Sequence, residues 1–262
     1  ADGALWRWDG YELKKAGFQD IAADSPELPE ILIAKADPVG VVWVGTSAGL
    51  FRLDRGRLVL ERVDDDQLNG LSPEFLTFDY VQGSQRIYMA SEHSLYVRQD
   101  GKSRKVHAGP DGNRIHALLM ANNGRLWIGS NDGLHFIDRD GTPQVYAALQ
   151  QMRISALYQS ASGSVWVGTA KNGIFRIDAE AKHHPLPLPE SGNQAPWIYD
   201  ISEARPGEYW FATFGNGILV YNELSGVFKP IRKERMLESN LLDNDVWVLF
   251  RDRAGLLWIG TR

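Results

Sequence analysis

The chain has 262 residues, a formal net charge of −5 and no cysteine. Hydrophobic residues make up 44% of it and charged residues 23%, a balance typical of a globular protein with a sizeable core. The missing cysteines exclude disulfides, thiolate metal sites and cysteine nucleophiles, and the acidic net charge argues against nucleic acid as a partner.

The sequence contains no targeting or membrane signal. No apolar run reaches the roughly 18 residues that span a bilayer, and residues 1–10 lack the charged and apolar segments of a signal peptide. We therefore expect no membrane contact by this region. The first residue is Ala1, which fits a processed or excised piece of a longer chain. Composition alone leaves the compartment open, because proteins without cysteine occur in reducing and oxidising compartments alike.

One phrase recurs along the chain. VWVGTSAGLFRLD begins at Val42, LWIGSNDGLHFID at Leu126, VWVGTAKNGIFRID at Val165 and YWFATFGNGILVYN at Tyr209. Aligning the aromatic residue near its start gives six repeat units, with spacings of 45, 39, 39, 44 and 48 residues, centred on Trp43, Tyr88, Trp127, Trp166, Trp210 and Trp258. This period is typical of one four-stranded propeller blade.

Each unit predicts the same succession of strands and turns. Twelve residues before the aromatic stands an apolar column, typical of an inner strand buried between neighbours: Ile31, Leu76, Ile115, Ile154, Ile198 and Val246. A glycine three residues before the aromatic predicts the first hairpin turn, with Gln85 as the exception: Gly40, Gly124, Gly163, Gly207 and Gly255. A second turn is predicted at Gly49, Gly133, Gly173 and Gly217, and a third at Asp54, Asp138, Asp178 and Asn222.

In the fourth unit this pattern predicts strands at 154–158, 165–168 and 174–177, followed by a weaker outer strand. The stretch HHPLPLPE, which begins with His183 and His184, is interpreted as a linker because it is rich in proline. No segment shows a sustained helical period.

The two ends carry complementary halves of a unit. Residues 1–10 resemble the second half of the phrase, whereas LLWIGTR at residues 256–262 contains only the first half. We therefore predict an all-β fold, a β-propeller of about six four-stranded blades that forms a single domain over residues 1–262. Two alternatives stay open at this point. Leu5–Trp8 pairs with Leu256–Ile259 and closes the ring, or the chain is a fragment of a longer propeller array, which does not exclude closure.

The segments WVGTSAGLFRLD, LWIGSNDGLHFID and DNDVWVLFRDRAGLLWIGT resemble the two-component regulator propeller repeat, and the resemblance covers essentially the whole chain. It implies a periplasmic sensor region of a hybrid two-component histidine kinase or a diguanylate cyclase. In that family a transmembrane helix and an output kinase or cyclase domain follow the repeats. The resemblance implies signal transduction after binding of a small molecule or an oligosaccharide, with homodimer formation of the full-length protein as one means of transmission.

A binding site is predicted where the inner strands begin, because propellers bind ligands at the mouth of the central channel. Residues thirteen and eleven positions before the aromatic vary between units. The candidates for ligand binding among them are Arg114, His116, Arg153, Trp197, Tyr199, Asp245 and Trp247. Aromatic faces suit stacking on a sugar-like or planar ligand, and arginines suit a forked contact with a carboxylate. The alternative is that these residues only fill the ends of the blade interfaces.

Catalysis has little support in the sequence. There is no Gly-x-Ser-x-Gly elbow, no His-Glu-x-x-His motif and no glycine-rich phosphate loop, so we expect no enzyme activity, no cofactor and no metal in this region. Asp79 and Asp200 on predicted inner strands keep a propeller enzyme open as an alternative, for instance a lyase or a glycoside-active enzyme. A protein-interaction propeller is the other alternative.

Overall fold

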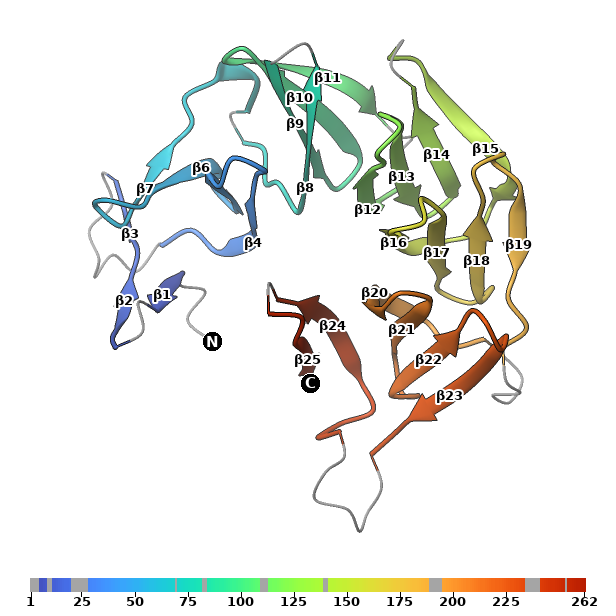
Figure 1. Cartoon of the computed structure of the whole chain (residues 1–262). Coiled ribbons are helices and arrows are strands. Elements are labelled where there is room, and N and C mark those ends of the chain that lie inside the picture. Colours follow the sequence, from blue (N-terminus) through green and yellow to red (C-terminus); the bar gives the residue numbers. More distant parts are fainter. Residues whose placement is uncertain are drawn as a thin grey trace. The chain divides into compact units, whose positions relative to one another are not determined.

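The computed structural model describes residues 5–8, 11–19, 28–68, 70–81, 84–108, 113–138, 141–188, 195–233, 241–252 and 254–262. These residues form successive antiparallel sheets (Figure 1), with one short 3-10 helix at Asp66–Leu68. The chain divides into two compact units, Ala1–Ile115 and His116–Arg262, called here unit 1 and unit 2. Each unit is described by itself.

Unit 1 holds a two-stranded hairpin and two larger sheets. The hairpin is β1 (Trp6–Trp8) with β2 (Leu13–Lys15). The first larger sheet has the order β3-β7-β6-β5-β4, from β3 (Gly17–Phe18), β4 (Ile31–Ala36), β5 (Val42–Thr46), β6 (Gly49–Asp54) and β7 (Val59–Arg62). The second sheet runs in chain order through β8 (Phe75–Val81), β9 (Ser84–Ser91), β10 (Ser94–Gln99) and β11 (Lys102–Ala108).

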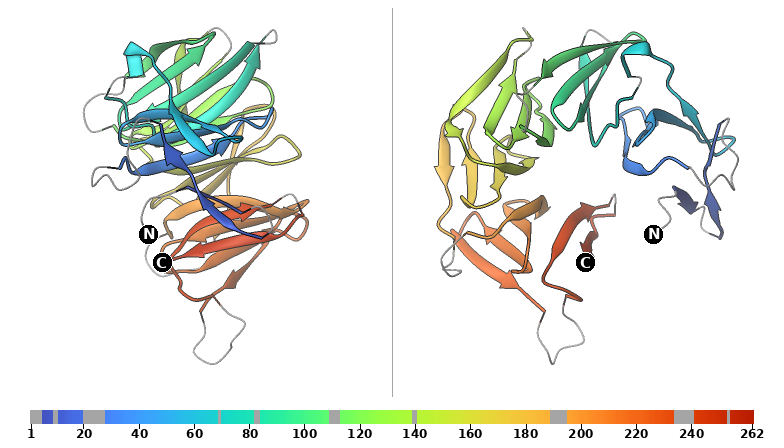
Figure 2. Two further views of the ribbon diagram at one scale, coloured as in Figure 1. Left: turned by 90° about the vertical axis from the view of Figure 1, so that its left-hand side faces the viewer. Right: turned by 180° about the vertical axis from the view of Figure 1, so that it is seen from behind.

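Unit 2 repeats the same four-stranded sheet three times and adds a two-stranded one. Its strands are β12 (Ile115–Met120), β13 (Leu126–Ser130), β14 (Gly133–Ile137) and β15 (Pro143–Gln150); β16 (Ile154–Gln159), β17 (Val165–Thr169), β18 (Ile174–Ile177) and β19 (His183–Pro185); β20 (Ile198–Arg205), β21 (Glu208–Thr213), β22 (Ile218–Asn222) and β23 (Val227–Ile231); then β24 (Val246–Arg251) and β25 (Leu257–Thr261). Figure 2 shows the same sheets from two further sides. The fold is that of β-propeller blades, as predicted.

Two details differ from the prediction. His183–Pro185 is not a linker but the outer strand β19, which pairs with β18. Proline is tolerated there because an edge strand does not need every backbone N–H. The second difference is β3, which adds a parallel fifth strand to β7 and lies outside the repeat pattern.

The turn residues behave as predicted. Gly163 between β16 and β17 has φ +90°, and Gly173 between β17 and β18 has φ +83°, a region that favours glycine. Gln85, the exception in the first glycine column, has a role of its own: its Nε2 donates to Oδ2 of Asp37, 2.7 Å away in the preceding blade. Asp37 also accepts from the indole of Trp43 at 3.1 Å, so Gln85 links the two sheets of unit 1.

In the complete blades the aromatic of the phrase packs in a core between consecutive sheets, whereas Trp258 of the final half-unit is 60% exposed. Trp166 is fully buried, and its ring centroid lies 4.1 Å from that of Tyr209 in the next sheet. In unit 1, Trp43 shares a buried cluster with Leu76 and Met89 of the following sheet. Each blade therefore buries its apolar face against its neighbour, as repeat architectures require.

The two half-units are present as separate two-stranded sheets, β1–β2 in unit 1 and β24–β25 in unit 2. The pairing of Leu5–Trp8 with Leu256–Ile259 concerns both units and stays a prediction. The description of residues 1–262 as a single domain also stays a prediction.

Candidate functional site

The starts of the inner strands come together in unit 2. Strands β16, β20 and β24 are the first strands of successive sheets, and β20 contacts both of the others. Arg153 directly precedes β16, Trp197 directly precedes β20, and Trp247 is the second residue of β24. Contacts through β20 bring these three side chains into one row.

Four of the predicted residues form a continuous stack. The guanidinium carbon of Arg153 lies 4.4 Å from the ring centroid of Trp197. Trp197 stacks on Tyr199 at 5.5 Å with an interplanar angle of 26°, and Tyr199 stacks on Trp247 at 4.8 Å and 12°. We call Arg153, Trp197, Tyr199 and Trp247 the aromatic ladder. It joins three successive sheets through cation–π and offset-stacking contacts.

The ladder is open to solvent at one end. Trp247 has one face covered by Tyr199 and is still 49% exposed. Phe214, which follows β21, meets the Tyr199 ring edge-on at 6.2 Å and is also 49% exposed. Exposed aromatic faces held by stacking on a partly buried ring such as Tyr199 are suited to binding flat or sugar-like rings.

Charged groups lie beside the ladder at both ends. Burial raises the pKa of Tyr199; the negative charge of Asp245 raises it further, and the positive charge of Arg153 opposes this. Asp245 is positioned by its Oδ1, which accepts from the backbone N–H of Gly215 at 2.8 Å. At the other end, Nε of Arg153 and Nε1 of Trp197 are buried and have no hydrogen-bond partner among the described residues. Buried donors that are left unsatisfied are costly, so acceptors are favoured there.

Two predicted residues have partners elsewhere. Nε2 of His116 lies 2.7 Å from Oδ1 of Asn131. Arg114, in unit 1, donates to Oε2 of Glu74 at 2.5 Å, and this contact raises the pKa of Arg114. The structure therefore groups Arg153, Trp197, Tyr199, Trp247 and Asp245, whereas it pairs Arg114 and His116 with other side chains.

Phe214 was missed by sequence reasoning. The corresponding positions, four residues after the phrase aromatic, hold Ser47, Glu92, Asn131, Ala170 and Arg262. A lone aromatic in a column of small or polar residues is the signal that marks it.

Asp200, the predicted catalytic alternative, joins two sheets. Its Oδ2 accepts from the backbone N–H of Leu249 on β24 at 2.9 Å, and its Oδ1 accepts from that of Ile201 at 2.8 Å. Burial raises the pKa of Asp200 to about 6. With both oxygens engaged by backbone donors, this carboxyl acts as a link between β20 and β24. Asp79 lies on β8 in unit 1.

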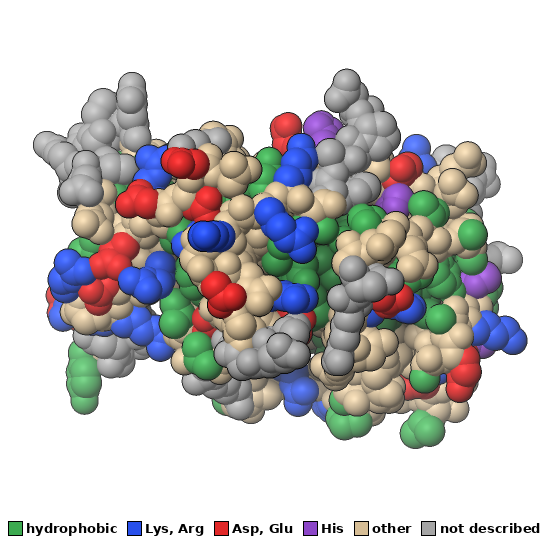
Figure 3. Space-filling view, turned by 90° about the horizontal axis from the view of Figure 1, so that it is seen from above, with side chains coloured by type: hydrophobic (Ala, Val, Ile, Leu, Met, Phe, Trp, Pro, Cys, Tyr) green, Lys and Arg blue, Asp and Glu red, His purple; other side chains and the backbone are tan. Residues whose placement is uncertain are grey.

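Other classes of site are not evident in the described residues. Among them, no group of three or more His, Cys, Asp or Glu side chains is placed to hold a metal ion. No helix within the described ranges is long and apolar enough to cross a membrane. On the face shown in Figure 3, Lys and Arg side chains are intermixed with Asp and Glu.

Residues 109–132 and 240–262 match the sequence model of the two component regulator propeller. These two segments resemble two-component regulator propeller repeats. This confirms the resemblance drawn from the phrase and its turns, and residues 240–262 include Asp245 and Trp247 of the candidate site. A comparison with curated proteins gave no significant match.

Several solved structures are similar to this chain in fold. The extracellular domain of a protein assigned as a hybrid two-component system from B. thetaiotaomicron has a TM-score of 0.60 and 17% identity, over 90% of this chain and 37% of that one. PorZ, a surface component of the type-IX secretion system of Porphyromonas gingivalis, has a TM-score of 0.63 and 18% identity, over 88% and 37%. Virginiamycin B lyase from Staphylococcus aureus has a TM-score of 0.67 and 12% identity, over 95% and 82%. At these identities the likeness shows the fold alone. The chain spans 37% of the length of the first two proteins.

Proposed function

We propose that this chain is the extracytoplasmic, periplasmic ligand-binding sensor region of a bacterial signal-transduction protein and is itself non-catalytic. The two-component regulator propeller repeats support a sensor, and the likeness to an extracellular domain supports the location. The observation that carries the proposal is the aromatic ladder across three consecutive sheets.

The ladder suits a small molecule or an oligosaccharide with a planar or sugar-like ring. The ring stacks on the open side of Trp247, and Phe214 borders it. Arg153 and Trp247 lie at opposite ends of the ladder, so only an extended ligand such as an oligosaccharide reaches both. Arg153 forms a charge-assisted hydrogen bond with a carboxylate at the far end of such a ligand, while Asp245 accepts from a hydroxyl group. A scaffold built from repeats needs only packing, so polar and aromatic side chains gathered in one row call for a separate explanation, and ligand binding supplies it.

The position of the ladder suggests how ligand binding is passed on to the rest of the protein. A ligand that contacts side chains from β16, β20 and β24 favours the arrangement of these sheets that it fits best, which is the differential affinity that signalling requires. In the full-length protein, an output kinase or cyclase domain and a homodimer would receive this change.

Calorimetry against a glycan and metabolite library tests the proposal. The Arg153→Ala and Trp247→Ala variants lose a charged hydrogen bond and an aromatic stack, which cost about 1 to 3 kcal/mol each, a tenfold or larger weakening. Trp258→Ala is the matched control, because Trp258 lies in the same half-blade, is 60% exposed and stands outside the ladder. We expect this control to bind like the wild type. If a ligand of the wild type binds equally well to both ladder variants, the ladder only fills the blade interfaces.

A further inference from the structure

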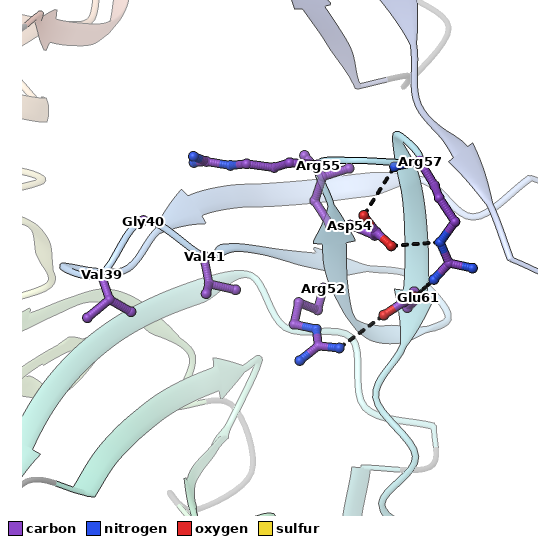
Figure 4. Close-up of a pocket in the computed structure, with 9 residues that line it drawn as sticks. Val39, Gly40, Val41, Arg52, Asp54, Arg55, Arg57 and Glu61 are labelled. Atoms are coloured by element: carbon purple, nitrogen blue, oxygen red, sulfur yellow. Dashed lines mark hydrogen bonds and ion pairs between the residues drawn. The ribbon is translucent and has the colours of Figure 1, made fainter.

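A hollow of about 520 Å³ lies in unit 1 at the turns of the first blade (Figure 4). It is bordered by Val39 and Gly40 of the β4–β5 turn and by Arg55 of the β6–β7 turn. Cavities that hold small molecules span about 300 to 1,000 Å³, so this volume is sufficient for one.

The charges in this hollow do not balance. Arg52, Arg55 and Arg57 line it together with the carboxylates of Asp54 and Glu61, which leaves one positive charge in excess. The chain as a whole carries a net charge of −5, so the local charge of the hollow is opposite in sign to the net charge of the chain.

Both carboxylates are already engaged. Oδ1 of Asp54 accepts from the backbone N–H groups of Gly56 at 2.8 Å and Arg57 at 3.1 Å, while its Oδ2 accepts from Nε of Arg57 at 2.7 Å. Glu61 accepts from Arg57 and, at 3.0 Å, from Arg52. The hydrogen bonds from Arg57 also hold the pKa of Asp54 below its ordinary value, so Asp54 stays ionised at neutral pH and protonates only under more acidic conditions.

Arg55 is the arginine of the hollow that neither carboxylate contacts. Its guanidinium makes no hydrogen bond or ion pair with the part of the chain that the structure describes. The side chain extends away from Arg57 toward the β4–β5 turn (Figure 4), and a Cβ placed on Gly40 would lie 3.8 Å from Nη1 of Arg55. A guanidinium presents five donors in a planar fork that matches a carboxylate.

We propose that this hollow binds a small organic carboxylate, held by Arg55 and covered on its apolar part by Val39 and Val41. Arg52 also lines the hollow, with its guanidinium turned toward Glu61 and away from Arg55 (Figure 4). Val39 is 73% exposed, which is the kind of apolar surface that a short hydrocarbon body covers.

The site is independent of the aromatic ladder and of the function proposed for it. All of its residues lie in unit 1, and the ladder lies in unit 2. The Arg55 guanidinium makes no ion pair or hydrogen bond with the described residues, so its removal leaves the fold intact and isolates its binding role.

Titration with butyrate, acetate and inorganic phosphate, followed by NMR shifts of the arginine Nε–H signals, tests the proposal. We expect butyrate to bind with a dissociation constant of about 1 mM or tighter, acetate to bind more weakly, and Arg55→Gln to weaken butyrate binding about tenfold. Arg104→Gln, which removes an exposed arginine on β11, is the matched control and should bind butyrate like the wild type. Trp247→Ala should also bind it unchanged.

Three outcomes overturn the proposal. They are an absence of butyrate binding to the wild type at tens of millimolar, equal binding by Arg55→Gln, and phosphate binding as tight as that of butyrate. The last result would mean that the hollow attracts anions in general without recognising a carboxylate.

Discussion

Gly168 on β17 is in direct contact with Ile198, the first residue of the inner strand β20 in the next sheet. A Cβ placed on Gly168 would lie 2.6 Å from Cγ2 of Ile198 and 2.8 Å from its Cβ. The same contact joins Gly129 and Ile154 at 2.7 Å. The glycine of the phrase therefore lets the apolar column of the following blade approach the backbone. One unit later, Ala212 shares a buried cluster with the smaller Val246.

The Gly168→Ala variant should be less stable than the wild type by about 1 to 3 kcal/mol, because the added methyl overpacks a rigid contact. Urea unfolding followed by tryptophan fluorescence measures this loss. Gly17→Ala is the matched control: Gly17 lies on β3 with nothing within 4 Å of its Cβ position, so its replacement should be neutral or slightly stabilising. Equal stability of the two variants would show that the sheets shift to accept the methyl.

The repeat columns predicted most of the fold because their chemistry is local. A glycine needed at positive φ and an apolar residue needed in an inner strand are visible in the sequence, and Gly163 and Ile154 occupy those places. The features that were not predicted depend on distant partners. Gln85 replaces a turn glycine because Asp37 lies across the interface, and β3 exists because β7 offers a free edge.

The grouping of most candidate residues could be predicted for the same reason, whereas their role in ligand binding stays a prediction. Residues on either side of the apolar column begin neighbouring inner strands, so their meeting follows from the repeat, and Trp197, Tyr199 and Trp247 do stack. Individual partners do not follow from it. Arg114 pairs with Glu74, which lies 40 residues away and outside the aligned columns.

Asp200 should make stability depend on pH. Its pKa is raised from 3.8 to about 6, so the folded state favours the protonated form. The contribution of Asp200 to stability is therefore fully present below pH 3.8 and is lost as the pH rises through 6. Two pKa units correspond to about 3 kcal/mol, so the stability of Asp200→Asn relative to the wild type should rise by about 2 to 3 kcal/mol between pH 4 and pH 7.

Urea unfolding at a series of pH values measures this difference. Asp252→Asn is a control for which the opposite pH dependence is expected. The hydrogen bond from Trp258 lowers the pKa of Asp252, so its contribution is present above pH 3.8 and is lost as the pH falls below that value. The Asp252→Asn variant should therefore lose stability relative to the wild type as the pH rises from acid to neutral. A pH-independent difference for Asp200→Asn would mean that this carboxylate is as well solvated in the folded chain as in the unfolded one.

Tyr199 is the middle rung of the aromatic ladder, with Trp197 at 5.5 Å on one side and Trp247 at 4.8 Å on the other. Tyr199→Ala removes two stacking contacts of about 0.5 to 1.5 kcal/mol each, so it should lower the free energy of unfolding by about 1 to 3 kcal/mol. The same variant should also weaken the binding of any ligand that stacks on Trp247, because the Trp247 ring loses the stacking contact that holds it in place. Tyr199→Phe keeps both stacks, and the hydroxyl it removes has no hydrogen bond within the described residues, so we expect wild-type stability and binding. Paired unfolding and calorimetric titrations of the two variants measure both effects. If Tyr199→Ala has wild-type stability and affinity, the ring contacts contribute nothing to either. If Tyr199→Phe loses as much stability and affinity as Tyr199→Ala, the effect belongs to the hydroxyl group.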